Sequence, residues 1–155
     1  AAFSSTDHPT ALVLSRQKLP NLAGSSFEGA LKGAYVISKE QKTPALTLIA
    51  TGSEVSLAVE IQSMLLADGI DTRVVSMPST NVFDTQSEAY KEEVYGLPYE
   101  KRVFLELGKS DMLYKYAKNV FGLDRFGLSA PGDKVAEKLG YTAEVLAEKI
   151  RKLLA

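Results

Sequence analysis

One arginine follows directly after an apolar run, a position that suits the binding of a phosphate group. The run Ala11–Leu14 is continuously apolar, which is typical of a strand buried on both faces, and Ser15-Arg16-Gln17 follows it. A guanidinium can donate two hydrogen bonds at once to two phosphate oxygens. Arginines at strand ends more often form exposed ion pairs worth about 0–1 kcal/mol. From the residues alone, such an ion pair is therefore the favoured role of Arg16.

A glutamate occupies a similar position further along the sequence. Glu106 ends the strand expected over 102–106, and open α/β sheets bind ligands at the carboxyl ends of their strands. A catalytic acid is conceivable there. Because buried polar groups are usually hydrogen-bonded, we favour a carboxylate that accepts from nearby backbone N–H groups.

A short glycine loop follows the same strand. Gly108-Lys109-Ser110 resembles the end of a phosphate-binding loop, but that motif requires a glycine at position 103, where this chain has valine. The favoured interpretation is a tight turn with a lysine that faces solvent.

A second loop, Thr51-Gly52-Ser53-Glu54, joins an expected strand to an expected helix. The N–H groups at a helix N-terminus attract anions, but the charge of Glu54 would repel a bound phosphate. Ser53 stands where an N-cap belongs and would accept from one of these N–H groups. We therefore expect a helix cap that satisfies itself rather than an anion site.

Two further features have no decisive local pattern. Asp124-Arg125-Phe126-Gly127 fits either a structural ion pair beside an aromatic side chain or part of an interface. The first eight residues, which include His8, are interpreted as a solvated leader or linker ahead of a domain over 9–155. They do not resemble a signal peptide, and no apolar run approaches the ~20 residues of a membrane helix.

Composition excludes several kinds of chemistry. The 155-residue chain has no cysteine and one histidine, so thiolate metal sites, a thiol nucleophile, a histidine-built metal site and a two-histidine catalytic pair are excluded. A nucleophile–histidine–acid set would require His8 to leave its polar leader. Eighteen basic and nineteen acidic residues give a net charge of −1, which predicts binding to neither nucleic acid nor membrane. The apolar fraction of 45% is ordinary for one globular domain.

The elements that would position these residues alternate between strands and helices. Strands are expected over 11–14, 35–37, 45–50, 72–76 and 102–106. Helices are expected over 54–67, from about 84 to 94, over 111–117, from Pro131 to the residue before Gly140, and after a cap at Thr142. In the last helix Leu146, Ile150 and Leu153 form one apolar stripe. Residues 45–76 form a βαβ unit, whose strands should be parallel. The pattern predicts a three-layer α/β/α domain with a mostly parallel sheet.

Several blocks of the sequence, in order and at matching spacing, resemble the C-terminal domain of transketolases. The blocks are Pro9–Gln17 with Leu19-Pro20, Gly33–Val36, Leu48–Val55, Arg73–Ser79, Phe83–Gln86 with Tyr90, Tyr114–Tyr116 and Asp124–Pro131. The chain departs from the family at Glu106-Leu107-Gly108, where Glu-Ala-Gly is frequent, and at Leu113, where a tryptophan is frequent. The resemblance implies a five-stranded sheet with one antiparallel strand.

The resemblance also implies a function. Transketolases move a two-carbon ketol unit from a ketose phosphate to an aldose phosphate, with thiamine diphosphate and a divalent metal (Mg or Ca) bound by other domains of a cytoplasmic homodimer. The third domain holds no cofactor or metal ligand, and the arginine of its Ser-Arg-Gln motif, here Arg16, binds the substrate phosphate. The chain alone is then expected to be inactive. A free-standing phosphate- or nucleotide-binding domain and a module that mainly supports the dimer are the alternatives.

Overall fold

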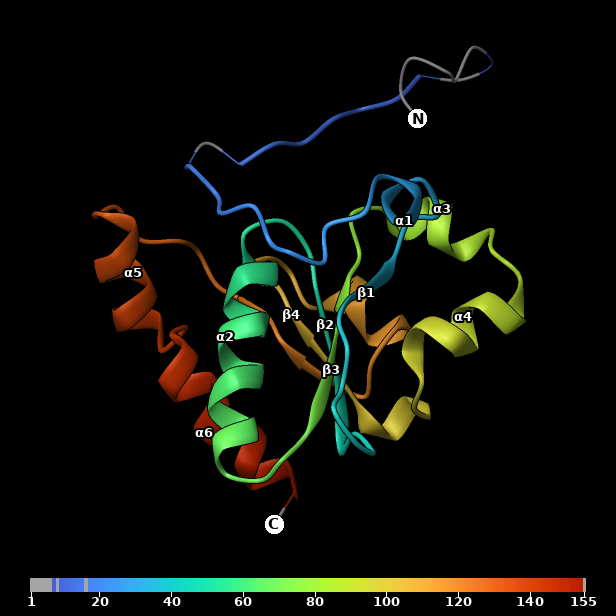
Figure 1. Cartoon of the computed structure of the whole chain (residues 1–155). Coiled ribbons are helices and arrows are strands. Elements are labelled where there is room, and N and C mark those ends of the chain that lie inside the picture. Colours follow the sequence, from blue (N-terminus) through green and yellow to red (C-terminus); the bar gives the residue numbers. More distant parts are fainter. Residues whose placement is uncertain (1–6, 8, 16, 155) are drawn as a thin grey trace.

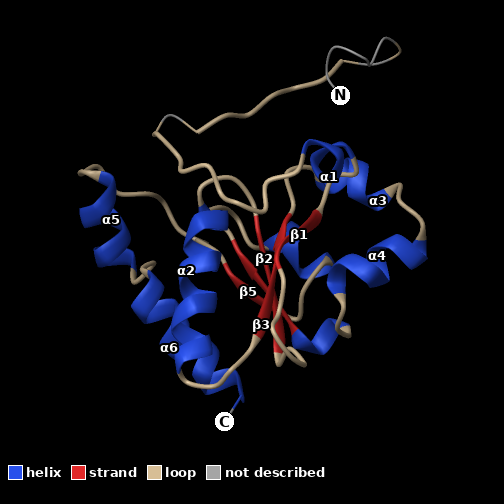
Figure 2. Ribbon diagram, in the orientation of Figure 1, coloured by secondary structure: helices blue, strands red, loops and turns tan. Residues whose placement is uncertain are grey.

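The computed structural model describes residues 7, 9–15 and 17–154, which form one five-stranded sheet between two layers of helices (Figures 1 and 2). The strands are β1 (Tyr35–Ser38), β2 (Leu46–Ala50), β3 (Thr72–Ser76), β4 (Arg102–Leu105) and β5 (Asn119–Phe121). Their order in the sheet is β1-β3-β2-β4-β5. β1 is antiparallel to β3, and the other pairs are parallel. The predicted fold class is confirmed.

The central strands are buried on both faces, as their continuous apolar sequence predicts. Successive side chains of a strand point to opposite faces, so Leu48 and Ile49 enter different cores. One core lies between the sheet and the helices α2 (Glu54–Ala67) and α6 (Ala143–Leu154). The other lies between the sheet and the segments that carry Phe83, Tyr95 and Tyr116. In Figure 1, α2 and α6 cover one side of the sheet and α4 (Glu88–Tyr95) covers the other.

The remaining helices are short. They are α1 (Phe27–Leu31), α3 (Thr80–Asp84), α4 (Glu88–Tyr95) and α5 (Gly132–Leu139), with 3₁₀ helices η2 (Tyr99–Lys101) and η3 (Asp111–Lys115). Gly96 and Gly140 end α4 and α5 in the left-handed conformation, where glycine avoids the steric cost of a Cβ. The helix predicted over 111–117 is a shorter 3₁₀ helix.

The parallel βαβ unit is confirmed, and α6 packs as its apolar stripe predicts. Leu146 and Ile150 are fully buried, whereas Leu153 is exposed. Arg151 of α6 donates from Nε to Asp68, just after α2, at 2.8 Å. The predicted i,i+4 pair between Glu148 and Lys152 forms at 2.8 Å.

The strand predicted over Ala11–Leu14 is wrong. This segment has no regular secondary structure, and Leu12, Val13 and Leu14 are 67%, 96% and 81% exposed. An apolar run is typical of a strand buried inside a domain, but the pattern alone does not require that the segment joins the sheet. The fifth strand is instead β5, whose three half-buried residues give too short a pattern to detect. No helix among the described residues has the length and apolar character needed to cross a membrane.

Candidate functional site at the carboxyl edge of the sheet

The candidate site lies where the strand order reverses. β2 is followed by α2 and β3 on one side, whereas its other neighbour is β4. Ala50 and Leu105, the last residues of β2 and β4, are register partners, so the segments that follow leave the sheet side by side. Open α/β sheets bind ligands in the crevice at such a point.

A cavity of about 780 Å³ opens at this edge. It is lined by Gln17, Ser53, Glu54, Leu107, Leu128, Ala130, Gly132, Asp133, Val135 and Ala136. Its polar lining comes mainly from the first turns of α2 and α5, and its apolar lining from the segments after β4 and β5. It therefore offers acidic and apolar surface together.

The predicted phosphate ligand Arg16 lies outside the described residues. Its neighbours are described, and both lie at this edge. Gln17 lines the cavity, and the hydroxyl of Ser15 lies 3.9 Å from the position that a Cβ would take on Gly52. The segment before and after Arg16 therefore passes close to the loop between β2 and α2.

Glu54, the first residue of α2, is buried, with 7% of its surface exposed. Its carboxylate accepts from the hydroxyl of Ser53, at 3.1 and 3.2 Å from the two oxygens. Ser53 occupies the predicted N-cap position, but the predicted cap hydrogen bond is wrong, because Ser53 has helical backbone angles and its side chain accepts no N–H of the helix. The hydroxyl instead faces the carboxylate, and burial raises the pKa of Glu54.

Glu106 is not the satisfied carboxylate that the sequence predicted. Its Oε2 atom is buried and has no hydrogen-bond partner among the described residues. Its own N–H donates to the carbonyl of Phe121 at 3.3 Å, and the hydroxyl of Tyr141 donates to that carbonyl at 2.8 Å. Burial, together with the charge of Glu54, raises the pKa of Glu106 to about 7. Sequence reasoning found each glutamate separately but missed that they interact.

The loops after β4 and β5 are joined by hydrogen bonds. Asp124 accepts from the N–H of Ser110 at 3.1 Å and from its hydroxyl. Lys109 is exposed and lies 3.1 Å from Asp111 and 3.4 Å from Asp124, so the predicted turn with a solvent-facing lysine is confirmed. Asp124 is thus held by the preceding loop. Phe126 is 96% exposed, which fits an interface better than an aromatic plug.

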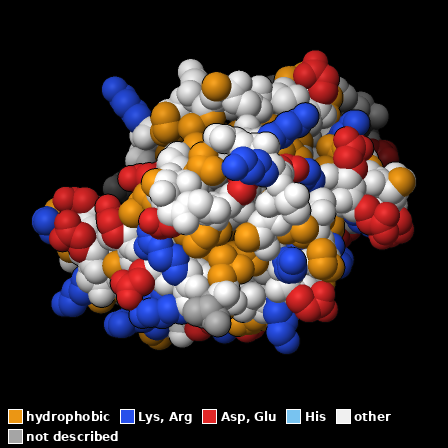
Figure 3. All heavy atoms as spheres, turned by 60° about the horizontal axis from the view of Figure 1, so that its bottom comes forward, with side chains coloured by type: hydrophobic (Ala, Val, Ile, Leu, Met, Phe, Trp, Pro, Cys, Tyr) orange, Lys and Arg blue, Asp and Glu red, His pale blue; other side chains and the backbone are white. Residues whose placement is uncertain are grey.

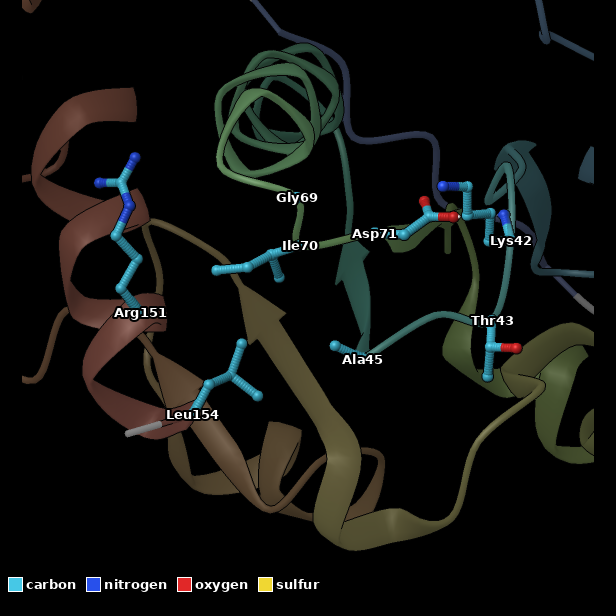
Figure 4. Close-up of a pocket in the computed structure, with 8 residues that line it drawn as sticks. All are labelled: Lys42, Thr43, Ala45, Gly69, Ile70, Asp71, Arg151 and Leu154. Carbon is cyan, nitrogen blue, oxygen red and sulfur yellow. Dashed lines mark hydrogen bonds between the residues drawn. The ribbon is translucent and has the colours of Figure 1, made fainter.

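A smaller cavity lies at the opposite edge of the sheet, and Asp71 and Arg151, which line it, have structural roles. This cavity of about 490 Å³ lies near the start of β2 and the end of α6 (Figure 4). Asp71 accepts from the N–H groups of Gln41 and Lys42 and so holds the turn between β1 and β2. Arg151 points away from the cavity and is bound to Asp68 (Figure 4). On the face shown in Figure 3, basic and acidic side chains are interspersed, with no large region of one sign.

The described residues contain no group of three or more histidine, cysteine, aspartate or glutamate side chains that could hold a metal ion.

Comparison with known proteins agrees with the resemblance. The family model described as "Transketolase-like TK C-terminal domain" matches residues 33–142. The transketolase of Bacillus subtilis is 46% identical over 160 residues, which cover 99% of this chain and 24% of that protein. The chain thus spans about a quarter of the length of this relative.

Solved structures give the same assignment. A transketolase of Pichia stipitis in complex with sedoheptulose-7-phosphate superposes with a TM-score of 0.83 and 40% identity, over 89% of this chain and 20% of that chain. Transketolase from Leishmania mexicana gives a TM-score of 0.81 and 36% identity, over 89% and 20%. The chain belongs to the transketolase C-terminal domain family.

Proposed function

We propose that this chain is the C-terminal domain of a transketolase, in which Arg16 binds the phosphate of the sugar phosphate substrate. The enzyme would transfer a two-carbon ketol unit from a ketose phosphate to an aldose phosphate. The observation that carries the proposal is the match over nearly the whole chain to proteins named transketolase, one of them solved with sedoheptulose-7-phosphate. The same proposal includes a homodimer in the cytoplasm.

The chemistry assigned to Arg16 needs a fork of donors at an accessible edge. A guanidinium pairs with two phosphate oxygens through parallel charge-assisted hydrogen bonds, which a lysine does not reproduce. The positions of Ser15 and Gln17 beside the carboxyl edge support a role at the point where ligands meet this fold.

The cofactor belongs to the rest of the longer protein under this proposal. Thiamine diphosphate, when bound with its divalent metal, supplies stabilisation of a carbanion on the transferred unit. The described residues offer no metal cluster. The contribution of this domain is to bind and orient the phosphate end of the substrate, and the chain alone would not catalyse ketol transfer.

A second contribution, support of the assembled enzyme, is favoured by the exposed apolar segment Ala11–Leu14. Val13 has almost its whole surface open to water, as does Phe126. Apolar side chains of this size gain about 1.5–3 kcal/mol each on burial. We propose that the cofactor-binding domains of the longer protein cover this segment.

The test is substitution of Arg16 in the full-length enzyme. Arg16→Ala should lower kcat/KM for phosphorylated substrates about 10- to 100-fold, because charge-assisted hydrogen bonds contribute about 1.5–3 kcal/mol each. It should leave a non-phosphorylated ketose almost unchanged. Lys18→Ala, an exposed cation two residues away, is the matched control. Equal losses for both kinds of substrate would refute the role of Arg16.

A further inference from the structure

The carboxyl edge holds two interacting carboxylates for which the proposed phosphate role has no use. Glu54 starts α2 directly after the loop that leaves β2, and Glu106 directly follows β4. Because β2 and β4 are neighbours and Ala50 pairs with Leu105, both glutamates follow adjacent strand ends at the same edge of the sheet. Both are taken out of water, Glu54 almost completely and Glu106 at its Oε2 atom.

No donor among the described residues balances two negative charges there. The hydroxyl of Ser53 donates to the carboxylate of Glu54, and the hydroxyl of Tyr141 donates to the carbonyl of Phe121. Burial and the charge of Glu54 both raise the pKa of Glu106, and no lysine or arginine of the described residues lowers it. A further carboxylate, that of Asp133 in α5, lines the adjoining cavity. A buried carboxylate without a partner is costly, and two that interact titrate as a pair.

The side chain of Glu106 lies against the loop that it begins. A Cβ placed on Gly108 would lie 3.3 Å from Oε1 of Glu106. The carbonyl of Gly108 accepts from the N–H of Leu123 at 2.7 Å, and Ser110 donates to Asp124. The position of the Glu106 side chain is therefore coupled to the loops after both β4 and β5.

We propose that Glu54 and Glu106 form a proton-operated switch, in which Glu106 keeps its proton while its carboxyl is buried beside the charge of Glu54 and, on losing it, loosens the loop of residues 106–110 together with that of residues 122–124. The second negative charge requires solvation, which the buried Oε2 atom of Glu106 lacks. The carboxylate of Glu106 must then turn toward water, and the backbone at Gly108 that packs on it moves with it. The edge of the domain that carries Gln17 and Ser53 thus responds to pH.

The experiment is an NMR titration of the 155-residue chain from pH 5 to 9. It follows the side-chain carboxyl carbon of Glu106 and the backbone amides of Gly108, Ser110 and Leu123. The carboxyl should titrate with a midpoint near pH 7, far above the ordinary value of about 4.3, and the amides should shift with the same midpoint.

Three variants separate the switch from a general effect of pH. E106Q mimics the protonated carboxyl and should abolish the pH dependence of the three amides. E54Q removes the interacting charge and should lower the midpoint of Glu106 by about half a unit to one unit. The control E92Q changes an exposed glutamate of α4 and should change nothing.

Two results would overturn the proposal: a midpoint of Glu106 close to the ordinary value, or loop amides that do not follow the carboxyl. A midpoint that E54Q leaves unmoved would overturn the pairing with Glu54. The wild-type titration alone decides the case if E106Q does not fold.

Discussion

Ser110 donates its backbone N–H to the carboxylate of Asp124 at 3.1 Å, and its hydroxyl donates to the same carboxylate. These bonds join the loop after β4 to the loop after β5, and they hold the pKa of Asp124 below its ordinary value. Ser110 is itself almost fully buried, whereas half of the Asp124 side chain is exposed, so the bonds tie a buried residue of one loop to the surface of the other. At the carboxyl edge, the loops that follow β4 and β5 are therefore held together.

The close approach of these loops requires a glycine at position 122. A Cβ there would lie 2.8 Å from the Cβ of Ser110 and 3.0 Å from the carbonyl oxygen of Gly108. We expect Gly122→Ala to lower the free energy of unfolding by about 1–3 kcal/mol, as overpacking does, measured by urea denaturation. Gly132→Ala is the matched control, because nothing lies within 4 Å of its Cβ position and the residue starts α5. If the two variants were equally stable, a Cβ at position 122 would not be crowded by Ser110 and Gly108.

The stability of the chain should fall as pH rises through the range in which Glu106 ionises. Its pKa is about 7 in the folded chain and near 4.5 in the unfolded one. Below pH 4.5 the carboxyl is protonated in both states, so it costs nothing. Between pH 4.5 and 7 the unfolded state loses the proton first, and the free energy of unfolding decreases. Above pH 7 the loss is complete.

Glu106→Gln tests this dependence. The full shift corresponds to about 3 kcal/mol, and we expect about 1–2 kcal/mol because water screens a partly exposed group. The variant should therefore exceed the wild type in stability at pH 8 and lose that advantage near pH 4.5, as measured by urea denaturation at both pH values. If the variant were less stable than the wild type at pH 8, the ionised carboxylate of Glu106 would stabilise the folded chain, contrary to this prediction.

The sequence predicted best those elements that have a regular spacing of apolar residues and a glycine that marks where the element ends. The helix of residues 54–67 has apolar spacing and ends before Gly69, and the helix before Gly96 ends at a left-handed glycine, as expected. The strand β5 has three residues, too few for a recognisable strand pattern, although Gly122 follows it directly. It forms because β4 offers a free edge, which is a property of the assembled sheet.

The candidate site was predicted less completely, for a related reason. Burial and strand position singled out Glu106, but the hydrogen-bond donors near it depend on tertiary contacts. Tyr141, 35 residues further on, donates its hydroxyl hydrogen bond to the carbonyl of Phe121, and Oε2 of Glu106 has no partner in the part of the chain that the structure describes. Ser53 occupies the N-cap position without a side-chain cap bond, and its hydroxyl donates a hydrogen bond to the adjacent carboxylate of Glu54. Neither arrangement is visible in local spacing.

The apolar segment Ala11–Leu14 gives a prediction that separates the chain from the longer enzyme. Val13 is 96% exposed, so Val13→Ser should change the free energy of unfolding of the 155-residue chain by less than about 0.5 kcal/mol. In the full-length protein the same change should lower stability, because the segment is covered there under our proposal. Thermal unfolding of both forms is the measurement. Val74→Ser, at a fully buried position of β3, is the control that should destabilise both forms. If Val13→Ser leaves the full-length protein as stable as the wild type, the segment is open to water there too, and the cofactor-binding domains do not cover it.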